Sequence, residues 1–262
     1  MGEDMHRRRL FVTGGGSGIG RAVARLFAER GWQVGLADID EAGLVAVQRE
    51  LPAGRASTHV MDVRDRAQWA AALADFAPDG RIDVVFNNAG IAASGGFADA
   101  DPSALERCIA INFTGVVHGA HAAHRYLKAT PGSCLLNTAS AAGIYGTAGA
   151  AIYSATKFAV RGLTEALDGE WRADGIKVRS LMPSFIDTPL LDALVPGTNA
   201  NVRERVAAAG LEFTPVERVA EAAWAAVQGD MVHTVVGKTA ERMKFAARWM
   251  PEKLRRQMGR GV

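Results

Sequence analysis

The chain has few cysteines and no long apolar run. Its 262 residues include two cysteines, Cys108 and Cys134, and no Cys-x-x-Cys pair, so we expect two reduced thiols in a reducing compartment. No stretch approaches the ~18 consecutive apolar residues of a membrane span. Residues 1–9 are polar and lack the apolar core of a signal peptide. These absences favour a cytoplasmic protein.

An excess of charge of one sign is also missing, because 30 Lys and Arg face 28 Asp and Glu. The formal net charge of +2 offers no overall attraction for nucleic acid, and no DNA- or RNA-binding motif is present. His118, His121 and His124 are spaced by three and would be neighbours on a helix. No cysteine or carboxylate pattern joins them to complete a ligand set. We therefore predict neither a nucleic-acid partner nor a metal.

Short apolar runs alternate with longer segments of helical periodicity. The segments that predict strands are 10–12, 33–38, 57–61, 82–86, 134–138, 177–182 and 233–236. The segments that predict helices are 18–31, 40–51, 64–76, 102–128, 151–173 and 215–228. Alternation of this kind favours an α/β fold, in which helices cover both faces of a parallel sheet. No linker divides the chain, so we expect a single domain over residues 1–262.

Two segments depart from this alternation. Residues 189–212 are less regular, and we interpret them as a substrate-loop insertion. Residues 238–262 carry eight Lys and Arg against two Glu, with apolar residues at helical spacing, which predicts a basic amphipathic C-terminal extension. We favour packing of this extension on the protein's own core or on another subunit. Contact with a membrane surface and a role as a substrate lid are the alternatives.

The glycine-rich loop 13–20 lies between the first predicted strand and the first predicted helix. Glycines let the backbone approach a pyrophosphate, and a helix N-terminus offers it free N–H groups. Asp38 ends the second strand, twenty residues after Gly18, where its carboxylate can bind both hydroxyls of an adenosine ribose. It would repel a 2′-phosphate, and neither Ser17 nor Ile39 is basic, so NAD is favoured over NADP. The alternative role for Asp38 is that of a helix cap.

Tyr153 and Lys157 lie four residues apart at the start of a predicted helix and therefore share a face. A free tyrosine has a pKa of about 10, but a nearby ammonium group favours the phenolate and lowers that pKa. The pair can then donate or accept the proton of an alcohol. Ser140 follows the strand that ends at Thr138, near the carboxyl end of the sheet, where open α/β sheets bind ligands. Its hydroxyl can hydrogen-bond a substrate oxygen.

Taken in order, these motifs resemble those of the short-chain dehydrogenase/reductase family over about residues 8–190. The loop 13–20 matches the family's Thr-Gly-x-x-x-Gly-x-Gly motif, and residues 87–90 match its Asn-Asn-Ala-Gly segment. Ser184 departs from the pattern, since the family usually has glycine after the proline that corresponds to Pro183. The resemblance implies a Rossmann-like, doubly wound α/β fold with a seven-stranded, mainly parallel sheet and helices on both of its faces.

The resemblance also implies functional residues. The catalytic set is Asn112, Ser140, Tyr153 and Lys157. The cofactor-binding set is Gly14, Ser17, Gly18, Ile19, Gly20, Asp38, Asp62, Val63, Asn88, Ala89, Gly90, Tyr153, Lys157, Pro183, Ile186 and Thr188. In oxidation, Ser140 would fix the substrate oxygen, and Tyr153 would remove the hydroxyl proton as hydride passes to the nicotinamide. Lys157 would lower the pKa of Tyr153 and bind the nicotinamide ribose, while Asn112 would hold a water of the proton relay.

The substrate pocket implied by the family lies between the loop after Ser140 and the segment after Thr188. Its expected lining is Ser140, Ala142, Ile144, Tyr145, Tyr153, Phe185, Leu190 and Leu191. An apolar lining favours a hydrophobic secondary alcohol or ketone, and hence an NAD-dependent oxidoreductase. The alternatives are a non-catalytic NAD-binding redox sensor, an NADP-dependent carbonyl reductase, and an isomerase or dehydratase on the same scaffold. The family also implies a homotetramer or homodimer, formed through the helices that carry Asn112 and Tyr153.

Overall fold

A computed structural model describes residues 7–194 and 200–259 of the chain. Its strands are β1 (Arg9–Thr13), β2 (Gln33–Asp38), β3 (Ala56–Val60), β4 (Val84–Asn87), β5 (Cys134–Thr138), β6 (Lys177–Pro183) and β7 (His233–Val236). They form one seven-stranded sheet in the order β3-β2-β1-β4-β5-β6-β7, and every neighbouring pair is parallel. The strand order reverses between β1 and β4, which confirms the doubly wound fold predicted from the sequence.

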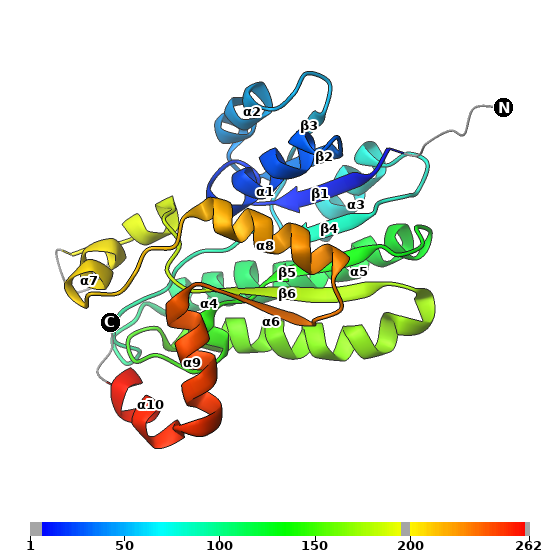
Figure 1. The fold of residues 1–262 in the computed structure, drawn as a ribbon. Coiled ribbons are helices and arrows are strands. Elements are labelled where there is room, and N and C mark those ends of the chain that lie inside the picture. The colour runs from blue at the N-terminus through cyan, green and yellow to red at the C-terminus, as the bar shows by residue number, and fades with distance from the viewer. Residues whose placement is uncertain (1–6, 195–199, 260–262) are drawn as a thin grey trace.

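Helices cover both faces of this sheet (Figure 1). They are α1 (Gly18–Glu29), α2 (Glu41–Glu50), α3 (Arg66–Phe76), α4 (Pro102–Ile109), α5 (Gly115–Lys128), α6 (Ala151–Glu170), α7 (Val202–Ala208), α8 (Val216–Gln228), α9 (Lys238–Trp249) and α10 (Pro251–Met258). The layer of α1, α2 and α8 packs on one face, and α3, α5 and α6 pack on the other. The strands point their carboxyl ends toward the side of the molecule where α7, α9 and α10 lie (Figure 1).

The apolar strands fill both layers because successive side chains point to opposite faces of a sheet. In β1, Leu10 and Val12 enter the cluster under α1 and α8, whereas Phe11 enters the cluster under α3 and α5. Trp69 of α3 is fully buried in this second cluster, and its indole N–H donates to the carbonyl of Val63 at 3.0 Å. The continuous apolar runs of the sequence therefore mark strands that are buried on both sides.

Three predicted segments differ in detail from the structure. The predicted helix 102–128 is divided by a π-helical segment, Ala110–Thr114, between α4 and α5. The predicted helix 151–173 ends as α6 at Glu170 and continues as a 3₁₀ turn, Trp171–Asp174. The insertion 189–212 contains a 3₁₀ turn, Pro189–Asp192, and the helix α7, while residues 195–199 lie outside the described residues.

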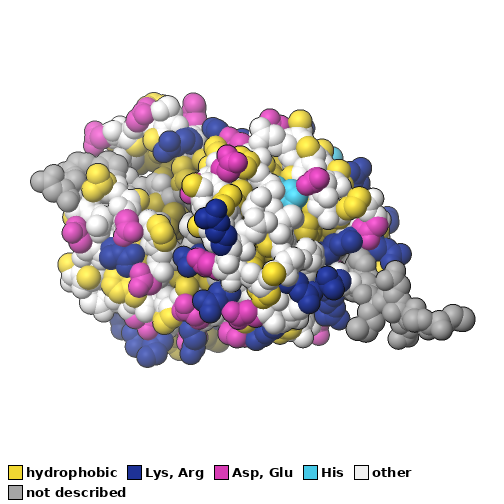
Figure 2. Space-filling model, turned by 90° about the horizontal axis from the view of Figure 1, so that it is seen from above, with side chains coloured by type: hydrophobic (Ala, Val, Ile, Leu, Met, Phe, Trp, Pro, Cys, Tyr) yellow, Lys and Arg dark blue, Asp and Glu magenta, His cyan; other side chains and the backbone are white. Residues whose placement is uncertain are grey.

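Ion pairs join neighbouring helices at the surface. Arg21 of α1 pairs with Glu50 of α2 at 2.9 Å, and Arg30, at the end of α1, pairs with Glu221 of α8 at 2.8 Å. On the face shown in Figure 2, basic and acidic side chains are interspersed. Within residues 7–194 and 200–259, no helix combines the length and the apolar character that a bilayer crossing requires.

A substitution at Gly119 tests the close packing of α5 against the sheet and α3. A Cβ atom at this position would lie 2.2 Å from Oδ1 of Asn87 and 2.7 Å from the Trp69 ring. Gly119→Ala should therefore lower the free energy of unfolding by about 2 kcal/mol, measured by urea denaturation. Gly162→Ala on α6 is the matched control, because its Cβ meets no atom within 4 Å among the described residues. It should raise stability by about 0.5–1 kcal/mol, and an equal effect of the two changes would contradict the packing described.

Candidate active site

The carboxyl ends of β1, β4 and β5 are tied together by hydrogen bonds between Thr13, Asn88 and Thr138. The Thr13 hydroxyl accepts the backbone N–H groups of Asn88 and Ala89, at 3.0 and 3.1 Å. The Asn88 side chain donates to the carbonyl of Thr13 at 3.0 Å and accepts from the Thr138 hydroxyl at 3.1 Å. The residues that follow these three strands are thereby held in a fixed relation to one another.

The glycine loop has a backbone that side chains would obstruct. Gly14 and Gly18 adopt positive φ angles of 66° and 51°, which favour glycine. A Cβ at Gly20 would lie 2.0 Å from the carbonyl oxygen of Gly14, so α1 can begin this close to the loop only with glycine there. Ser17, the N-cap of α1, makes no side-chain capping bond in the described structure. The first N–H groups of α1 thus lack a side-chain cap, as an anion-binding helix end requires.

Asp38 borders this loop. Its Oδ2 accepts the backbone N–H of Gly16 at 3.0 Å, and its Oδ1 accepts that of Asp40 at 3.1 Å. The N-cap of α2 is Asp40, whose side chain accepts from Gly43 N. The alternative role of Asp38 as the cap of the second helix is therefore wrong.

Asp62 and Val63, two residues of the predicted cofactor-binding set, follow β3. Asp62 pairs with Arg64 at 2.5 Å, and this hydrogen bond lowers the pKa of the Asp62 carboxyl. The Val63 side chain approaches Gly115 so closely that a Cβ there would lie 2.8 Å away. Asp62 and Val63 are thus fixed at the start of the segment that leads to α3.

Ser140, Tyr153 and Lys157 meet beyond the end of β5. Ser140 caps a 3₁₀ turn, Ala141–Gly143, through a bond from Ala142 N to its Oγ at 3.1 Å. Tyr153 and Lys157 lie in the first two turns of α6, and Lys157 Nζ donates to the carbonyl of Thr138 at 2.9 Å. Nζ lies 5.5 Å from the centre of the Tyr153 ring. The Ser140 side chain lies near the Tyr153 hydroxyl and acts to lower its pKa.

Gly143, which the sequence analysis did not single out, allows this meeting. A Cβ at Gly143 would lie 2.9 Å from the backbone oxygen of Lys157, so the 3₁₀ turn rests directly on α6. The signal in the sequence is a lone glycine three residues after Ser140, which by itself indicates only a turn.

Burial shifts both ionisable groups of this pair toward their neutral forms. It lowers the pKa of Lys157 to about 8. Burial likewise raises the pKa of Tyr153, although the hydrogen bond from Ser140 opposes this rise. The predicted lowering of the Tyr153 pKa by Lys157 is therefore not found. Removal from water is the largest cause of both shifts.

Asn112 lies in the π-helical segment and is fully buried. Its Oδ1 accepts the N–H of Ile91 at 2.8 Å, and its Nδ2 donates to the carbonyl of Ile91 at 2.9 Å. A Cβ at Gly90 would lie 3.2 Å from Asn112 Oδ1 and 3.7 Å from Lys157 Nζ. The structure therefore brings Asn112 and Lys157 to the backbone that follows β4, as the predicted catalytic set requires. π-Helical segments are frequent at functional sites because they leave backbone groups without their regular helical partners.

The segment after β6 closes the opposite side of the glycine loop. Thr188 lies near Gly18, since a Cβ on the glycine would be 3.4 Å from its side chain. Pro183 ends β6, and Ile186 is buried and forms a bridge with Thr214. Gly18, in the loop after β1, and Thr188, after β6, thus lie next to each other.

Arg203 of α7 holds the segment after β6 in place. Sequence reasoning missed this residue because it lies in an irregular stretch without a motif. Its guanidinium donates to the carboxylates of Asp187 at 2.5 Å and Asp192 at 2.8 Å. It also donates to the carbonyl of Thr188 at 3.2 Å. One planar side chain therefore connects α7 to the segment that contains Thr188, a residue of the predicted cofactor-binding set.

The predicted substrate residues come from two parts of the sequence, one before Tyr153 and one after it. Ile144 and Tyr145 pack partly on the C-terminal helices, against a cluster that includes Met243 and Leu254. Leu191 is buried, whereas Leu190 remains 39% exposed. Ala142 and Phe185 are partly buried. Ile144 and Tyr145 therefore contribute to packing as well as to the predicted pocket.

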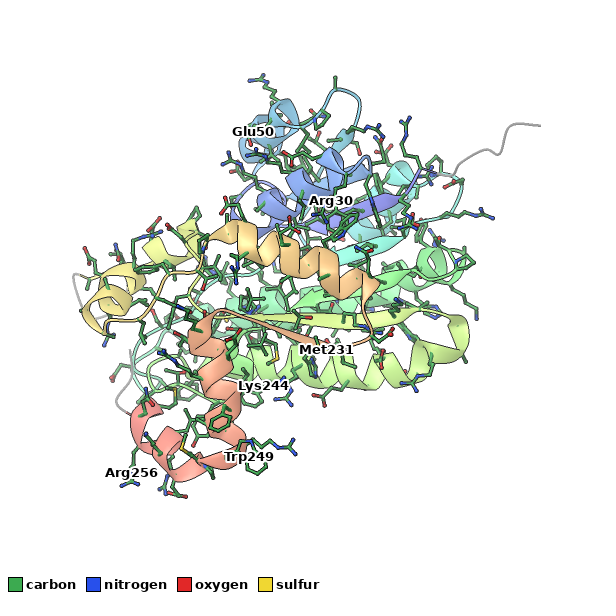
Figure 3. All side chains as sticks on the ribbon, in the orientation of Figure 1. Arg30, Glu50, Met231, Lys244, Trp249 and Arg256 are labelled. Carbon is green, nitrogen blue, oxygen red and sulfur yellow. The ribbon has the colours of Figure 1, made fainter. Side chains whose placement is uncertain are left out.

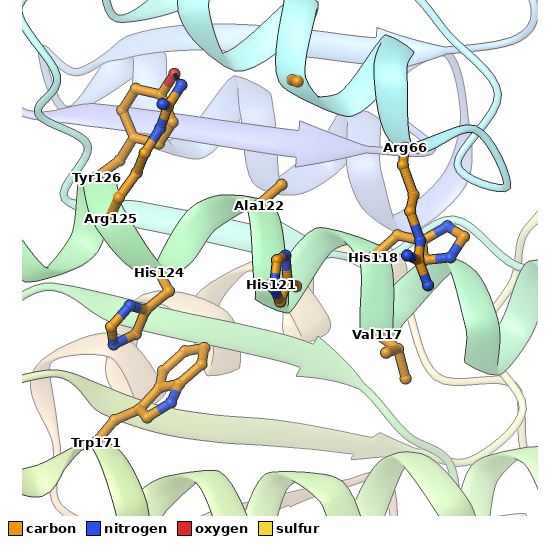
Figure 4. A pocket seen from close by; sticks show the side chains of 10 residues that line it. Arg66, Val117, His118, His121, Ala122, His124, Arg125, Tyr126 and Trp171 are labelled. Atoms are coloured by element: carbon orange, nitrogen blue, oxygen red, sulfur yellow. Dashed lines mark hydrogen bonds between the residues drawn. The ribbon is translucent and has the colours of Figure 1, made fainter.

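The three spaced histidines line a hollow of about 650 Å³ on the outer side of α5 (Figure 4). His118 lies toward Arg66 and His124 toward Trp171, with His121 between them (Figure 4). His124 bonds to Asp174 at 2.8 Å and contacts the Trp171 ring in a tilted arrangement, with ring centres 4.8 Å apart. In the part of the chain that the structure describes, no three His, Cys, Asp or Glu side chains are grouped as a metal ion would require.

Comparison with known proteins places the site in a family context. Residues 8–199 match the family model described as short chain dehydrogenase. The chain is 35% identical over 199 residues to meso-2,3-butanediol dehydrogenase of Serratia marcescens, covering 76% of this chain and 79% of that protein. It is 39% identical over 212 residues to cis-4-hydroxycyclohexanecarboxylate dehydrogenase of Sinomonas cyclohexanicum, covering 79% of this chain and 83% of the relative.

Among solved structures, the fold is similar to a short chain dehydrogenase/reductase from Burkholderia phymatum in complex with NAD. The TM-score is 0.83 with 26% identity, over 97% of this chain and 96% of that chain. The likeness therefore extends beyond the segment matched by the family model and includes the C-terminal helices.

The burial of Lys157 makes a prediction about stability and pH. With a folded pKa of about 8 against 10.5 for the ordinary amine, the charged form opposes folding by up to about 3 kcal/mol below pH 8. This penalty disappears as the pH rises toward 10.5. Lys157→Met removes it and loses one hydrogen bond, worth about 1 kcal/mol. The variant should therefore be about 2 kcal/mol more stable at pH 7 and lose this advantage by pH 10.

Urea denaturation of the cofactor-free protein between pH 7 and pH 10 measures this difference. Burial raises the pKa of Tyr153 above its ordinary value, so the folded tyrosine stays mainly neutral over this pH range. Lys177→Met is the matched control, because Lys177 Nζ makes the same kind of bond, to the carbonyl of Gln228 at 3.0 Å, on the surface. A Lys157→Met protein that is less stable than the wild type at pH 7 would contradict the burial argument.

Proposed function

Because the chain belongs to the short-chain dehydrogenase family, we propose that it transfers a hydride between NAD and a hydrophobic secondary alcohol or ketone. The observation that carries the proposal is the meeting of Ser140, Tyr153 and Lys157 at the carboxyl end of β5, beside the glycine loop that follows β1. Hydroxyl groups that face one another next to a dinucleotide loop suit proton transfer to a reacting oxygen.

The residues fit a dinucleotide cofactor. The cradle between Gly14, Gly18 and the N-terminus of α1 has the positive φ angles and the uncapped helix end that a pyrophosphate needs. Asp62 and Val63 would border the adenine, and Asn88, Ala89 and Gly90 would lie along the ribose and nicotinamide side. We also assign to this site Ser17, Ile19, Gly20, Pro183, Ile186 and Thr188. The bound cofactor would supply the hydride chemistry, and the chain would supply position and proton transfer.

The choice of NAD rests on Asp38. Its carboxylate is held at the edge of the glycine loop by the N–H groups of Gly16 and Asp40. A carboxylate there accepts hydrogen bonds from two ribose hydroxyls and repels a 2′-phosphate. Ile39, the next residue, is 68% exposed and carries no charge that would bind such a phosphate. NADP-dependent carbonyl reduction is therefore the weaker alternative.

Tyr153 is the proposed general acid and base. In oxidation its phenolate takes the substrate hydroxyl proton, and in reduction its hydroxyl gives a proton to the carbonyl oxygen. Ser140 hydrogen-bonds the same substrate oxygen. Lys157 Nζ, held by the carbonyl of Thr138, would bind the cofactor ribose. Asn112 would place a water that returns the proton to solvent.

The substrate class follows from the side chains around this centre. Ala142, Ile144, Tyr145, Phe185, Leu190 and Leu191 offer apolar surface, and none of them would pair with a phosphate or a polyanion. A hydrophobic secondary alcohol or ketone fits such a lining.

The chain is also proposed to form a homodimer or homotetramer through α5 and α6. The hollow at Val117, His121, Ala122, Tyr126 and Trp171 gives α5 an outer surface that a second copy could cover.

Tyr153→Phe tests the catalytic assignment. Removal of the hydroxyl should lower turnover by at least about 100-fold, because no other group replaces the proton transfer. NAD affinity, measured by fluorescence titration, should stay within about threefold. Tyr126→Phe is the control, since its hydroxyl contacts Arg125 on the outer part of α5. Near-normal turnover of Tyr153→Phe would refute the role of Tyr153, and a wild-type protein that binds NAD but turns over no alcohol or ketone would favour the redox sensor.

Asp38→Ala tests the cofactor preference. The wild type should use NAD(H) and largely ignore NADP(H) with the same substrate. The variant should lose at least about tenfold in kcat/KM for NAD and gain efficiency with NADP, because it loses ribose hydrogen bonds and a repelling charge. Asp40→Ala should weaken the cap of α2 by about 1 kcal/mol without changing the cofactor ratio. A wild-type preference for NADP would overturn the assignment of NAD.

A further inference from the structure

The two C-terminal helices α9 and α10, residues 238–258, form what we call the C-terminal hairpin. Its inner face packs on the protein through Ala240, Met243 and Leu254, which are buried against Ala141. The carbonyl of Met258 accepts the N–H of Ala148 at 3.2 Å, which fixes α10 on the loop before α6. The hairpin is thus an ordered part of the fold.

The outer face of the hairpin combines aromatic and basic side chains. Lys238, Arg242, Phe245 and Trp249 follow one another at spacings of four, three and four residues, which places them on one side of α9. All four are exposed, with Phe245 at 58% and Trp249 at 64% of their surface. Met250, at the turn to α10, is 38% exposed. Large apolar side chains presented together on a basic helix require an explanation that core packing does not give.

The charge of the chain is concentrated here. Residues 238–258 contain seven Lys and Arg and two Glu, a surplus of five positive charges. The whole chain has a surplus of only two, so the remainder carries a net negative charge of three. Within the described residues, the only ion pair found for these seven side chains is that of Arg255 with Glu252, at 3.5 Å. The other basic groups of the hairpin are therefore available to an external anion.

We propose that the outer face of the C-terminal hairpin docks on the surface of an anionic phospholipid bilayer. Phe245 and Trp249 would enter the boundary between headgroups and acyl chains, where aromatic side chains are favoured. The basic side chains around them would contact lipid phosphates. Lys244, Trp249 and Arg256 all point away from the ribbon at this end of the molecule (Figure 3).

A lipid surface fits this face better than a second copy of the chain. In a two-fold contact the same residues face each other, so two surfaces with a surplus of five positive charges each would repel. A nucleic acid would match the charge, but Phe245 and Met250 offer it apolar contact without hydrogen-bonding groups. A bilayer with anionic headgroups matches both the charge and the apolar side chains.

Docking there would bring the lipid surface close to the proposed substrate pocket. The hairpin packs on Ile144 and Tyr145, which we assign to that pocket. A hydrophobic substrate dissolved in the bilayer would then have a short path to Tyr153. This last step depends on the proposed function, whereas docking itself requires neither cofactor nor turnover.

Co-sedimentation with vesicles, without cofactor or substrate, tests the docking. One set of vesicles contains equal parts of phosphatidylglycerol and phosphatidylcholine, and the other contains phosphatidylcholine alone. The full-length protein should bind the anionic vesicles, and the binding should weaken as salt screens the charges. Equal binding to both kinds of vesicle, or binding to neither, would overturn the proposal.

Two double variants separate the two contributions. Phe245→Ser/Trp249→Ser should weaken binding to anionic vesicles by at least about tenfold, because it removes the buried aromatic surface. Lys244→Glu/Arg248→Glu should do the same by reversing two charges at the surface. Met231→Ser is the matched apolar control, since Met231 is 69% exposed outside the hairpin, and Arg49→Glu/Arg66→Glu is the matched charge control.

The controls should bind like the wild type, and thermal unfolding shows that each variant is folded. Loss of binding in the controls, or retention of binding in both hairpin variants, would contradict docking through this face. Sedimentation velocity of the same proteins shows whether Phe245→Ser/Trp249→Ser breaks an oligomer. Such a change, or a shift of a polynucleotide in a gel without vesicle binding, would assign the face to a second copy or to nucleic acid instead.

Discussion

The hydrogen bonds of Thr13 and Asn88 hold together the edge of the sheet on which the site depends. They join β1 to the segment after β4, and the Thr138 hydroxyl extends the connection to β5. The glycine loop leaves from Thr13, and the turn that begins at Ser140 leaves from Thr138. Because each segment begins at a fixed strand end, the glycine loop and the turn at Ser140 keep their relative positions.

The pair of the partly buried Tyr153 and the buried Lys157 shows why such support is needed. Removal from water raises the pKa of the tyrosine and lowers that of the lysine to about 8, so the site disfavours the charged forms of both groups. The hydrogen bond from Lys157 Nζ to the carbonyl of Thr138 holds the lysine side chain in place against that tendency. Perturbed pKa values in a packed environment are typical of catalytic sites. The burial of such ionisable groups lowers the free energy of unfolding.

The alternation of apolar and helical segments was enough to predict the seven strands and their parallel sheet, because buried parallel strands have an unmistakable pattern. The division of the helix 102–128 was not predictable, since a π-helical turn changes the hydrogen bonds without changing the composition. The motifs predicted which residues the structure brings together around Tyr153. The direction of its pKa shift was wrong, because the sequence contains the ammonium group but not the degree of burial. Arg203 acts through contacts across an irregular segment, which no spacing rule predicts.

For the C-terminal extension, the sequence left packing and membrane contact as alternatives, and the structure shows packing on one face of the helices and exposed side chains on another. The helical periodicity of α9 buries Ala240 and Met243 and leaves Phe245 and Trp249 exposed. Internal packing therefore accounts for one face of this helix and not for the other. The residues buried under the hairpin also contact Ile144 and Tyr145. Any partner that binds the outer face therefore acts on an element that supports the wall of the proposed substrate pocket. In this respect the hairpin differs from a surface tail, which could bind a membrane without any effect on the site.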